Sequence, residues 1–320
     1  MTCIRCKHNT AYKFGTYGKR KVQRYRCHSC KATFADAPAK TLGSHYTDID
    51  RASKVFALML EGMSIRAISR ALEIDKNTVM SLMVSAGERA QALFDSRVQS
   101  IPAKHVQADE VWGFCHTKEA RTRKDDPDEW GHSYLWVALD ADTKLVVAFH
   151  TGKRSPGDAY QFISELANRV HGYFQLTTDG YGAYRQPIED LLWSRTDYAQ
   201  LVKVFQNPTG AGPDWYGTGK ILKQVPSDIH GMPDPDHIST SYVERWNLGL
   251  RMHLRRFTRL TNAHSKKLEN HKAAIALYMA WYNFCRVHSS LRVTPAMEAG
   301  LTNHVWSIAE LLGDVVVESL

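Results

Sequence analysis

The sequence predicts a multidomain protein that joins a small zinc ribbon, an all-α helix-turn-helix unit and an α/β domain. Two CxxC pairs stand within the first 30 residues, and two short amphipathic segments follow a polar linker. From about residue 101, strand-like runs alternate with helical ones. A chain of 320 residues is longer than one typical domain. We therefore expect domains at 1–40, 46–98 and 101–300, and a C-terminal tail at 301–320.

The positive charge of the chain is concentrated at its N-terminal end. The whole chain carries a net charge of +8, and residues 1–40 alone hold ten Lys or Arg against one acid, Asp36. A basic tract of this kind indicates a phosphate-rich partner. The opening stretch has no apolar signal segment, and no later run is long enough to span a bilayer. We expect a cytoplasmic protein with no membrane partner.

The two CxxC pairs predict a structural Zn²⁺ site. Their spacing is typical of a four-thiolate site in which each pair forms a tight turn and the hairpin between them closes the tetrahedron. A disulfide is less expected in a cytoplasmic chain, and a redox CxxC usually stands near a βαβ unit. His8 and His28 are possible substitute ligands. The expected ligands are Cys3, Cys6, Cys27 and Cys30.

The segment between the CxxC pairs alternates basic and aromatic residues, a pattern that suits contacts with phosphates and bases. The alternative is a solvated hairpin that is held by aromatic packing. The basic residues that we expect to contact DNA here are Lys19, Arg20, Lys21 and Arg24.

Residues 48–83 have the spacing of a helix-turn-helix. Apolar residues recur at helical intervals over 48–61, Ser64 is placed to cap a short second helix, and Asp75 is placed to cap a third. Recognition helices meet base edges at their exposed start. Short helix pairs are also common in proteins that bind no DNA. The residues expected at this DNA-binding surface are Lys76, Asn77, Thr78 and Ser81.

The α/β part has the element order of an RNase H-like core. Strands are predicted at 104–114, 133–140, 144–151, 173–179 and 198–205, with helices at 156–172 and about 182–193. In such a core the first and fourth strands are neighbours, so Asp109 should lie beside Asp179. A strand that ends in an acid commonly presents a catalytic or metal-binding carboxylate. The alternative is that Asp179 and Gly180 form an ordinary turn.

A third acid is expected from the helix at 241–257. Its apolar residues form one stripe that can dock on the sheet, and a polar face lies beside that stripe. A lattice of surface salt bridges is the other explanation for such a face. From 244 to 272 there are eight Lys or Arg and two acids, a second tract suited to a phosphate backbone. The polar face consists of Glu244, Asn247, Arg251 and Arg255.

Three nearby acids are not expected to belong to this site. Glu110 follows Asp109 on a strand, so its side chain should point to the opposite face of the sheet. Asp140 and Asp142 are expected to be acids of a hairpin turn.

Several of these segments resemble motifs of bacterial insertion-sequence transposases of the DDE type. They are "QADEVWGF", "TTDGYGAY", "YVERWNLGLRMHLRRFTRL" and "SKKLENHKAAI". The resemblance is closest to the insertion-sequence-one-like group, which couples a zinc ribbon and a helix-turn-helix to an RNase H-like catalytic domain. Glu244 followed seven positions later by Arg251 matches a hallmark of that family. The resemblance covers nearly the whole chain in the family's order and is weakest over 206–240.

This resemblance implies that Asp109, Asp179 and Glu244 form a catalytic triad that holds Mg²⁺ or Mn²⁺. It implies a transposase that binds the terminal inverted repeats of its own element, hydrolyses phosphodiester bonds at the ends and joins the 3′ ends to target DNA. The expected partners are double-stranded DNA and further copies of the chain, as a homodimer or higher oligomer, in the nucleoid region of a bacterial cytoplasm. Two alternatives remain: a catalytically inactive, domesticated DNA-binding regulator, and a nuclease without strand transfer.

Overall fold

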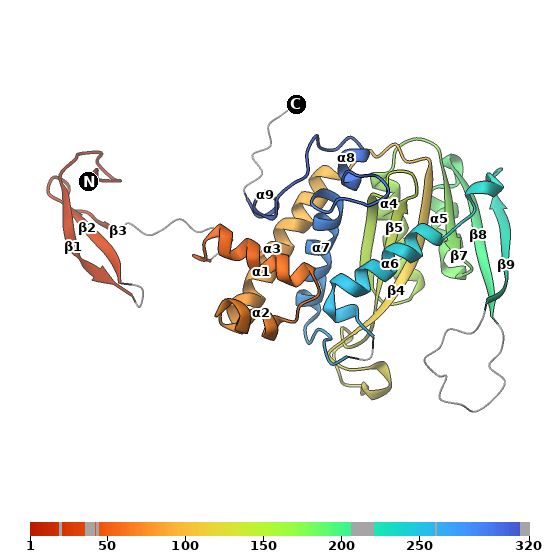
Figure 1. Ribbon diagram of the computed structural model, residues 1–320, viewed down its shortest axis with the longest axis horizontal. Coiled ribbons are helices and arrows are strands. Elements are labelled where there is room, and N and C mark those ends of the chain that lie inside the picture. The colour runs from red at the N-terminus through yellow and green to blue at the C-terminus, as the bar shows by residue number, and fades with distance from the viewer. Residues whose placement is uncertain (19–20, 36–41, 43–44, 206–220, 260, 314–320) are drawn as a thin grey trace. The chain divides into compact units, whose positions relative to one another are not determined.

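The chain forms two compact units, residues 1–48 and residues 49–320. The computed structural model describes residues 1–18, 21–35, 42, 45–205, 221–259 and 261–313 (Figure 1). Among these residues, every helix is too short or too polar to cross a membrane.

The first unit is a three-stranded antiparallel sheet with a very small core. Its strands are β1 (Ala11–Tyr17), β2 (Val22–Cys27) and β3 (Thr33–Ala35), in the order β1-β2-β3. The buried core consists of Cys3, Cys27 and Phe34, against which Cys6, Ala11 and Tyr25 pack. So few buried residues give little stability, and a unit of this size usually needs a metal or a disulfide.

The helices that open the second unit begin where the sequence predicts caps. They are α1 (Ile49–Leu60), α2 (Ile65–Leu72) and α3 (Lys76–Arg97). The Ser64 hydroxyl accepts a hydrogen bond from the backbone N–H of Ala67, and the Asp75 carboxylate accepts one from that of Asn77. Both bonds satisfy N–H groups that have no partner within their helix. The two expected helix starts are confirmed.

A six-stranded mixed sheet lies at the centre of the second unit, in the order β6-β5-β4-β7-β8-β9. Its strands are β4 (His105–Cys115), β5 (Gly131–Asp140), β6 (Val146–Gly152), β7 (Phe174–Asp179), β8 (Thr196–Phe205) and β9 (Ile221–His230). β4 pairs parallel with β7, and β7 pairs parallel with β8, whereas the other pairs are antiparallel. The predicted strand order is confirmed, and β9 is an additional strand.

Helices cover both faces of this sheet (Figure 1). α4 (Pro156–Arg169) and α5 (Arg185–Leu191) lie on one face, where the ring of Phe162 meets that of Trp136 at 5.9 Å. α6 (Ser241–His253) lies on the other face, where the side chain of Gln107 accepts hydrogen bonds from the backbone N–H groups of Tyr242 and Val243. Because Gln107 and Trp136 lie on opposite faces, the strands are buried on both sides.

The helical segment that was expected as a separate domain at 46–98 belongs to the same compact unit as the sheet. α3 packs against the buried helix α7 (Leu268–Phe284), and a Cβ atom on Gly87 would lie only 2.3 Å from the backbone oxygen of Ala273. α8 (Pro295–Glu298) closes the expected 101–300 domain and buries Ala296, and the expected tail contributes α9 (Ile308–Leu312), which buries Leu311 and Leu312. The physical reason for one unit is that α3 and α9 bury apolar side chains against α7, which itself contacts β6 of the sheet.

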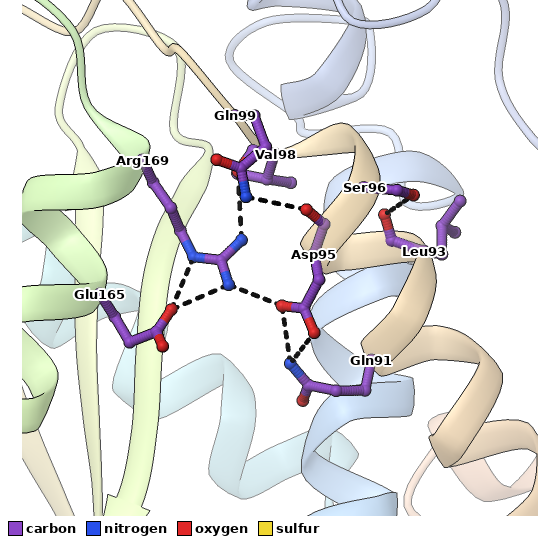
Figure 2. Close-up of polar contacts among 8 residues, drawn as sticks. All are labelled: Gln91, Leu93, Asp95, Ser96, Val98, Gln99, Glu165 and Arg169. Carbon is purple, nitrogen blue, oxygen red and sulfur yellow. Dashed lines mark hydrogen bonds and ion pairs between the residues drawn. The ribbon is translucent and has the colours of Figure 1, made fainter.

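A buried arginine also ties α3 to the α/β part (Figure 2). Arg169, at the end of α4, donates to the Asp95 carboxylate of α3 at 2.6 Å, to Glu165 at 2.9 Å and to the backbone oxygen of Val98 at 3.2 Å. Only 6% of Arg169 is exposed, so these acceptors compensate for the loss of its hydration. The contact fixes the end of α3 against α4.

Replacing Gly87 by Ala should destabilise the second unit by about 1–3 kcal/mol. Ala normally stabilises a helix interior relative to Gly by about 0.5–1 kcal/mol. At Gly87 the new methyl group would overlap the backbone of Ala273, so the steric cost should exceed that gain. Urea unfolding of the full chain measures the change. Gly157→Ala in α4 is the matched control, because only Ser155 Oγ, at 3.8 Å, lies near its added methyl. Unchanged or increased stability of Gly87→Ala would contradict the close packing of α3 and α7.

Candidate active site and zinc site

The parallel pairing of β4 with β7 places Asp109 level with Asp179. Gln107 pairs with Thr177, so two residues further on Asp109 reaches the height of Asp179, the last residue of β7. Oxygen atoms from the carboxylates of Asp109, Glu110 and Asp179 lie within 4.8 Å of one another. The expectation that Asp109 and Asp179 lie close together is confirmed; their catalytic role stays a prediction.

The expectation that Glu110 points away from this site was wrong. Its side chain leaves β4 on the face opposite that of Asp109, as strand alternation requires. Because β7 ends at Asp179, carboxylates from both faces meet around that end of the sheet. The Glu110 side chain is only 3% exposed, and its Oε1 has no hydrogen-bond partner among the described residues. A buried carboxylate oxygen without a partner is costly and suits a cation ligand.

Arg154 provides the nearest positive charge. Its Nη2 lies 3.3 Å from Glu110 and 3.6 Å from Asp179, and its guanidinium lies 4.0 Å above the ring of Tyr181. Arg154 follows β6, and β6 runs parallel to β4 because each pairs antiparallel with β5. β6 and β7 therefore run in the same direction as β4, and both end beside the part of β4 that follows Gln107. That strand direction is the sequence signal by which Arg154 could have been predicted.

α6 turns a polar face toward Asp109. Asn247 Nδ2 donates a hydrogen bond to Asp109 Oδ2 at 2.7 Å, so Asn247 holds a carboxylate of the cluster; its contact with DNA stays a prediction. Glu244 lies one turn earlier on α6 but is not one of the three clustered carboxylates. It forms an ion pair with Lys203 of β8 and accepts a hydrogen bond from the hydroxyl of Thr240. For Glu244 to bind an ion with Asp109, it must exchange Lys203 for that ion.

Two carboxylates of this cluster, Asp109 and Glu110, have raised pKa values. Burial raises the pKa of Asp109 to about 7, and the negative charges of Asp179 and Glu244 act in the same direction. Burial also raises the pKa of Glu110 to about 7, again with a contribution from Asp179. A bound cation would offset this repulsion, and Mg²⁺ and Mn²⁺ prefer carboxylate oxygens. Asp109, Glu110 and Asp179 therefore fit a hard divalent cation.

α6 is shorter than the sequence predicts. It ends at His253, and Arg255 begins a separate 3-10 turn, η6 (Arg255–Phe257), so Arg255 does not share the face of Glu244. The chain changes direction after α6, and Leu254 and Phe257 are buried there. Arg251 remains on α6 and donates to the backbone oxygen of Phe257 at 3.2 Å. Burial, and then the charge of Arg259, lowers the pKa of Arg251 to about 10.

The start of the expected recognition helix borders a cavity of about 880 Å³. Lys76 and Asn77 line it from α3, and Arg255 lines it from the segment that follows α6. Thr78 is half-buried and Ser81 is exposed. The structure thus brings together two groups of residues that were predicted separately to bind DNA.

The four expected zinc ligands lie together in the first unit. The Sγ atoms of Cys3 and Cys30 are 3.6 Å apart, those of Cys6 and Cys27 are 3.5 Å apart, and all four lie within 4.8 Å of one another. These separations are too long for disulfides, whose sulfurs lie about 2 Å apart. They suit a tetrahedral ion with Zn–S bonds of about 2.3 Å. The hydroxyl of Thr10, as the largest cause, lowers the pKa of Cys27 to about 5, which favours the thiolate.

The basic residues of the ribbon are partly placed. Lys21 is exposed at the turn between β1 and β2, and the guanidinium of Arg24 lies 5.6 Å from the ring of Phe14. Lys19 and Arg20 lie outside the described residues.

The two acids expected in the hairpin turn are found there. Asp140 ends β5 and accepts hydrogen bonds from Thr143 and the N–H of Asp142. The Asp142 carboxylate lies 3.0 Å from His105 Nδ1.

Purified protein is expected to contain one Zn²⁺ per chain, and Cys27→Ser should abolish both the zinc and the folded first unit. Because the core of this unit is so small, the free energy of Zn²⁺ binding is expected to supply the free energy that keeps the unit folded. Metal analysis by mass spectrometry and limited proteolysis of residues 1–48 measure the two effects. Cys285→Ser, outside the cluster, is the matched control. A folded, protease-resistant first unit without zinc would contradict the assignment.

No family model matches this sequence, and no curated protein matches it. Among solved structures, it resembles an intasome of simian T-cell lymphotropic virus in complex with PP2A regulatory subunit B56 gamma (12% identity, 78% of this chain and 74% of that chain, TM-score 0.35). It also resembles the piggyBac transposase synaptic complex with hairpin DNA (13% identity, 82% and 69%, TM-score 0.37). A third is the Mos1 transposase paired-end complex with left transposon end (16% identity, 50% and 62%, TM-score 0.18). The structures it resembles are transposase and intasome complexes, but at these TM-scores we draw no conclusion from the likeness.

Proposed function

We propose that this protein is a DNA transposase of the DDE type with an RNase H-like core, of the insertion-sequence-one-like group. In this proposal it binds the terminal inverted repeats of its own element, hydrolyses phosphodiester bonds at the ends and joins the 3′ ends to target DNA. The observation that carries the proposal is the convergence of Asp109 and Asp179 at the end of parallel strands, with Asn247 of α6 bound to Asp109.

Each side chain at this site would have a distinct role in metal binding, positioning or charge balance. Asp109 and Asp179 would hold Mg²⁺ or Mn²⁺, and Glu244 would complete the coordination after leaving Lys203. The ions would activate water or a 3′-hydroxyl and stabilise the departing alkoxide. Asn247 orients Asp109 through its 2.7 Å hydrogen bond. Arg154 balances the charge of Asp179 and Glu110.

DNA would be held by the basic parts of both units. The first unit would contribute its basic ribbon, and α3 would contribute Lys76, Asn77 and Ser81, which are exposed. Phosphate contacts of this kind give affinity and register, and base contacts give sequence preference. We expect a dimer or higher oligomer, because joining two ends of one element requires two sites, and we expect the protein in the bacterial cytoplasm with the nucleoid.

The test is an assay of cleavage and joining with labelled DNA from the end of the element and a target duplex. Nicked and joined products should form with Mg²⁺ or Mn²⁺ and not without a divalent cation. Specific binding without cleavage under all these conditions would reject the enzyme and favour the DNA-binding regulator. Cleavage without joined product would favour a nuclease without strand transfer.

A further inference from the structure

A second cavity, of about 720 Å³, lies beside the part of β4 that extends past the end of β7. β7 covers the edge of β4 only from His105 to Gln107. Beyond Asp109 that edge faces residues 256–259 and 261–264, and the cavity lies between the strand edge and these residues. At its far end the backbone N–H of His116 donates to the backbone oxygen of Ser265 at 2.8 Å. The cavity is therefore framed by a strand edge and a loop.

Backbone groups of β4 face into this cavity. The backbone oxygen of Lys104 accepts from Gln175 of β7, and the N–H of His116 donates to Ser265, so both groups point away from β5. Alternation along a strand without a bulge puts the backbone groups of Trp112 and Phe114 on the same edge. The parallel bridge between Cys115 and Ser265 occupies the backbone oxygen of Phe114, whereas within the described part of the chain Trp112 has no hydrogen-bond partner on that edge. Free N–H and C=O groups can therefore bind a polar ligand there.

The side chains around the cavity combine aromatic faces with positive charge. Phe114 stacks on His264 with their ring centroids 4.6 Å apart, and Trp112 lines the cavity beside them. His264 Nδ1 is buried and has no partner among the described residues. Among the described residues, those that line the cavity and carry a charge are all basic. They are Lys118, Arg121, Arg256 and Arg259.

We propose that this cavity binds an unpaired nucleotide of the DNA strand near the point of cleavage, an inference that rests on the proposed function. Its volume is in the range of small-molecule sites and well below that of a duplex. Aromatic walls stack on the face of a base, and that face is free only when the base is unpaired. Strand-edge N–H and C=O groups suit the polar edge of the base, and the exposed side chains of Lys118, Arg121 and Arg259 suit the flanking phosphates.

The position of the cavity predicts which nucleotide it holds. Trp112 follows Asp109 by three residues on a straight strand, so their Cα atoms lie roughly 10 Å apart and their side chains leave the strand on opposite faces. In a B-form strand this distance corresponds to about three nucleotides. The bound nucleotide should therefore lie about three positions from the cleaved phosphate.

The test compares two labelled DNA probes with full-length protein and no divalent cation. One probe is a blunt duplex from the element's end, and the other carries a four-nucleotide single-stranded overhang. Fluorescence anisotropy should show that wild-type protein binds the overhang probe at least about fivefold more tightly. Trp112→Ala should lose this preference and keep its affinity for the blunt duplex, whereas Trp112→Phe, which retains an aromatic face, should keep most of the preference.

A charge variant and a matched control complete the experiment. Arg259→Gln, at an exposed side chain, should weaken binding of the overhang probe and lower its salt dependence by about one counterion. Trp193→Ala is the control, because Trp193 is 40% exposed, stacks on His230 and does not line the cavity. An overhang preference that survives in Trp112→Ala would overturn the proposal. No preference in the wild type, together with a change in sedimentation in Trp112→Ala, would also overturn it and would assign the strand edge to a protein partner.

The outcome is separable from the proposed function. Asp179→Asn should lose cleavage but keep the overhang preference, because Asp179 does not line the cavity. Wild-type cleavage with no overhang preference would reject the nucleotide site alone. An overhang preference without wild-type cleavage would reject the transposase activity and leave the nucleotide site supported.

Discussion

Replacing Asp179 by Asn is expected to lower both cleavage and joining by about three orders of magnitude or more. Asn keeps the shape of the side chain but removes the anionic oxygen that a divalent cation requires. The change should not unfold the protein, because Arg154 keeps a carboxylate partner in Glu110 at 3.3 Å. The measurement is the yield of nicked and joined products from labelled end DNA with Mg²⁺, beside a binding assay that should show unchanged affinity.

The control for Asp179→Asn must lie outside the carboxylate cluster. Asp190→Asn makes the same chemical change at an exposed position on α5, where only Gln186 bonds to the carboxylate. Glu110→Gln is unsuitable as a neutral control, because Glu110 lies within the cluster. Cleavage by Asp179→Asn at the level of Asp190→Asn would remove Asp179 from the active site and return it to the role of a turn residue.

Replacing Asp109 by Asn is expected to stabilise the metal-free protein at pH 8 and, at the same time, to abolish cleavage. Burial, with the charges of Asp179 and Glu244, raises the pKa of Asp109 to about 7 from an ordinary value of 3.8. Between these two pH values the folded chain binds a proton that the unfolded chain has released, so stability falls as pH rises through this window. Above pH 7 the cost of the buried charge is about 2–4 kcal/mol.

Asn cannot ionise, so the variant should avoid this cost. Its amide oxygen can still accept the hydrogen bond from Asn247. The backbone N–H of Glu110 then loses its acceptor, Asp109 Oδ1. This loss reduces the gain in the free energy of unfolding by about 1 kcal/mol. We expect a net gain of about 1–3 kcal/mol at pH 8 and no gain near pH 4.

Urea unfolding of metal-free protein from pH 4 to pH 8 tests this expectation. Glu110 also titrates near pH 7, and the charge of Asp109 contributes to its raised pKa, so the difference between wild type and variant includes the coupling of these two carboxylates. Asp190→Asn should follow the wild-type curve. A variant that is less stable than wild type at pH 8, or a difference that does not change with pH, would contradict a raised pKa of Asp109. Gain of stability with loss of activity is the pattern expected when a site is arranged for a ligand rather than for the fold.

The sequence by itself determined the features that depend on neighbours along the chain. The CxxC spacing placed the four thiols, and Ser64 and Asp75 marked two helix starts because capping needs only a side-chain oxygen near the next N–H groups. Strand periodicity and the order of strands and helices placed Asp109 beside Asp179, because parallel strands joined by crossovers present their ends at one edge.

Only the tertiary structure decided which groups meet around the end of β7. Alternation along β4 sends Glu110 to the opposite face, yet the sheet ends at Asp179, so Glu110 and Arg154 reach the same place. The pairing of Glu244 with Lys203, and the packing of Gly87 against Ala273, likewise join segments far apart in the chain. Such contacts depend on where strands stop and how closely helices approach. Burial of apolar surface by the whole unit sets both, and the local sequence pattern does not encode them.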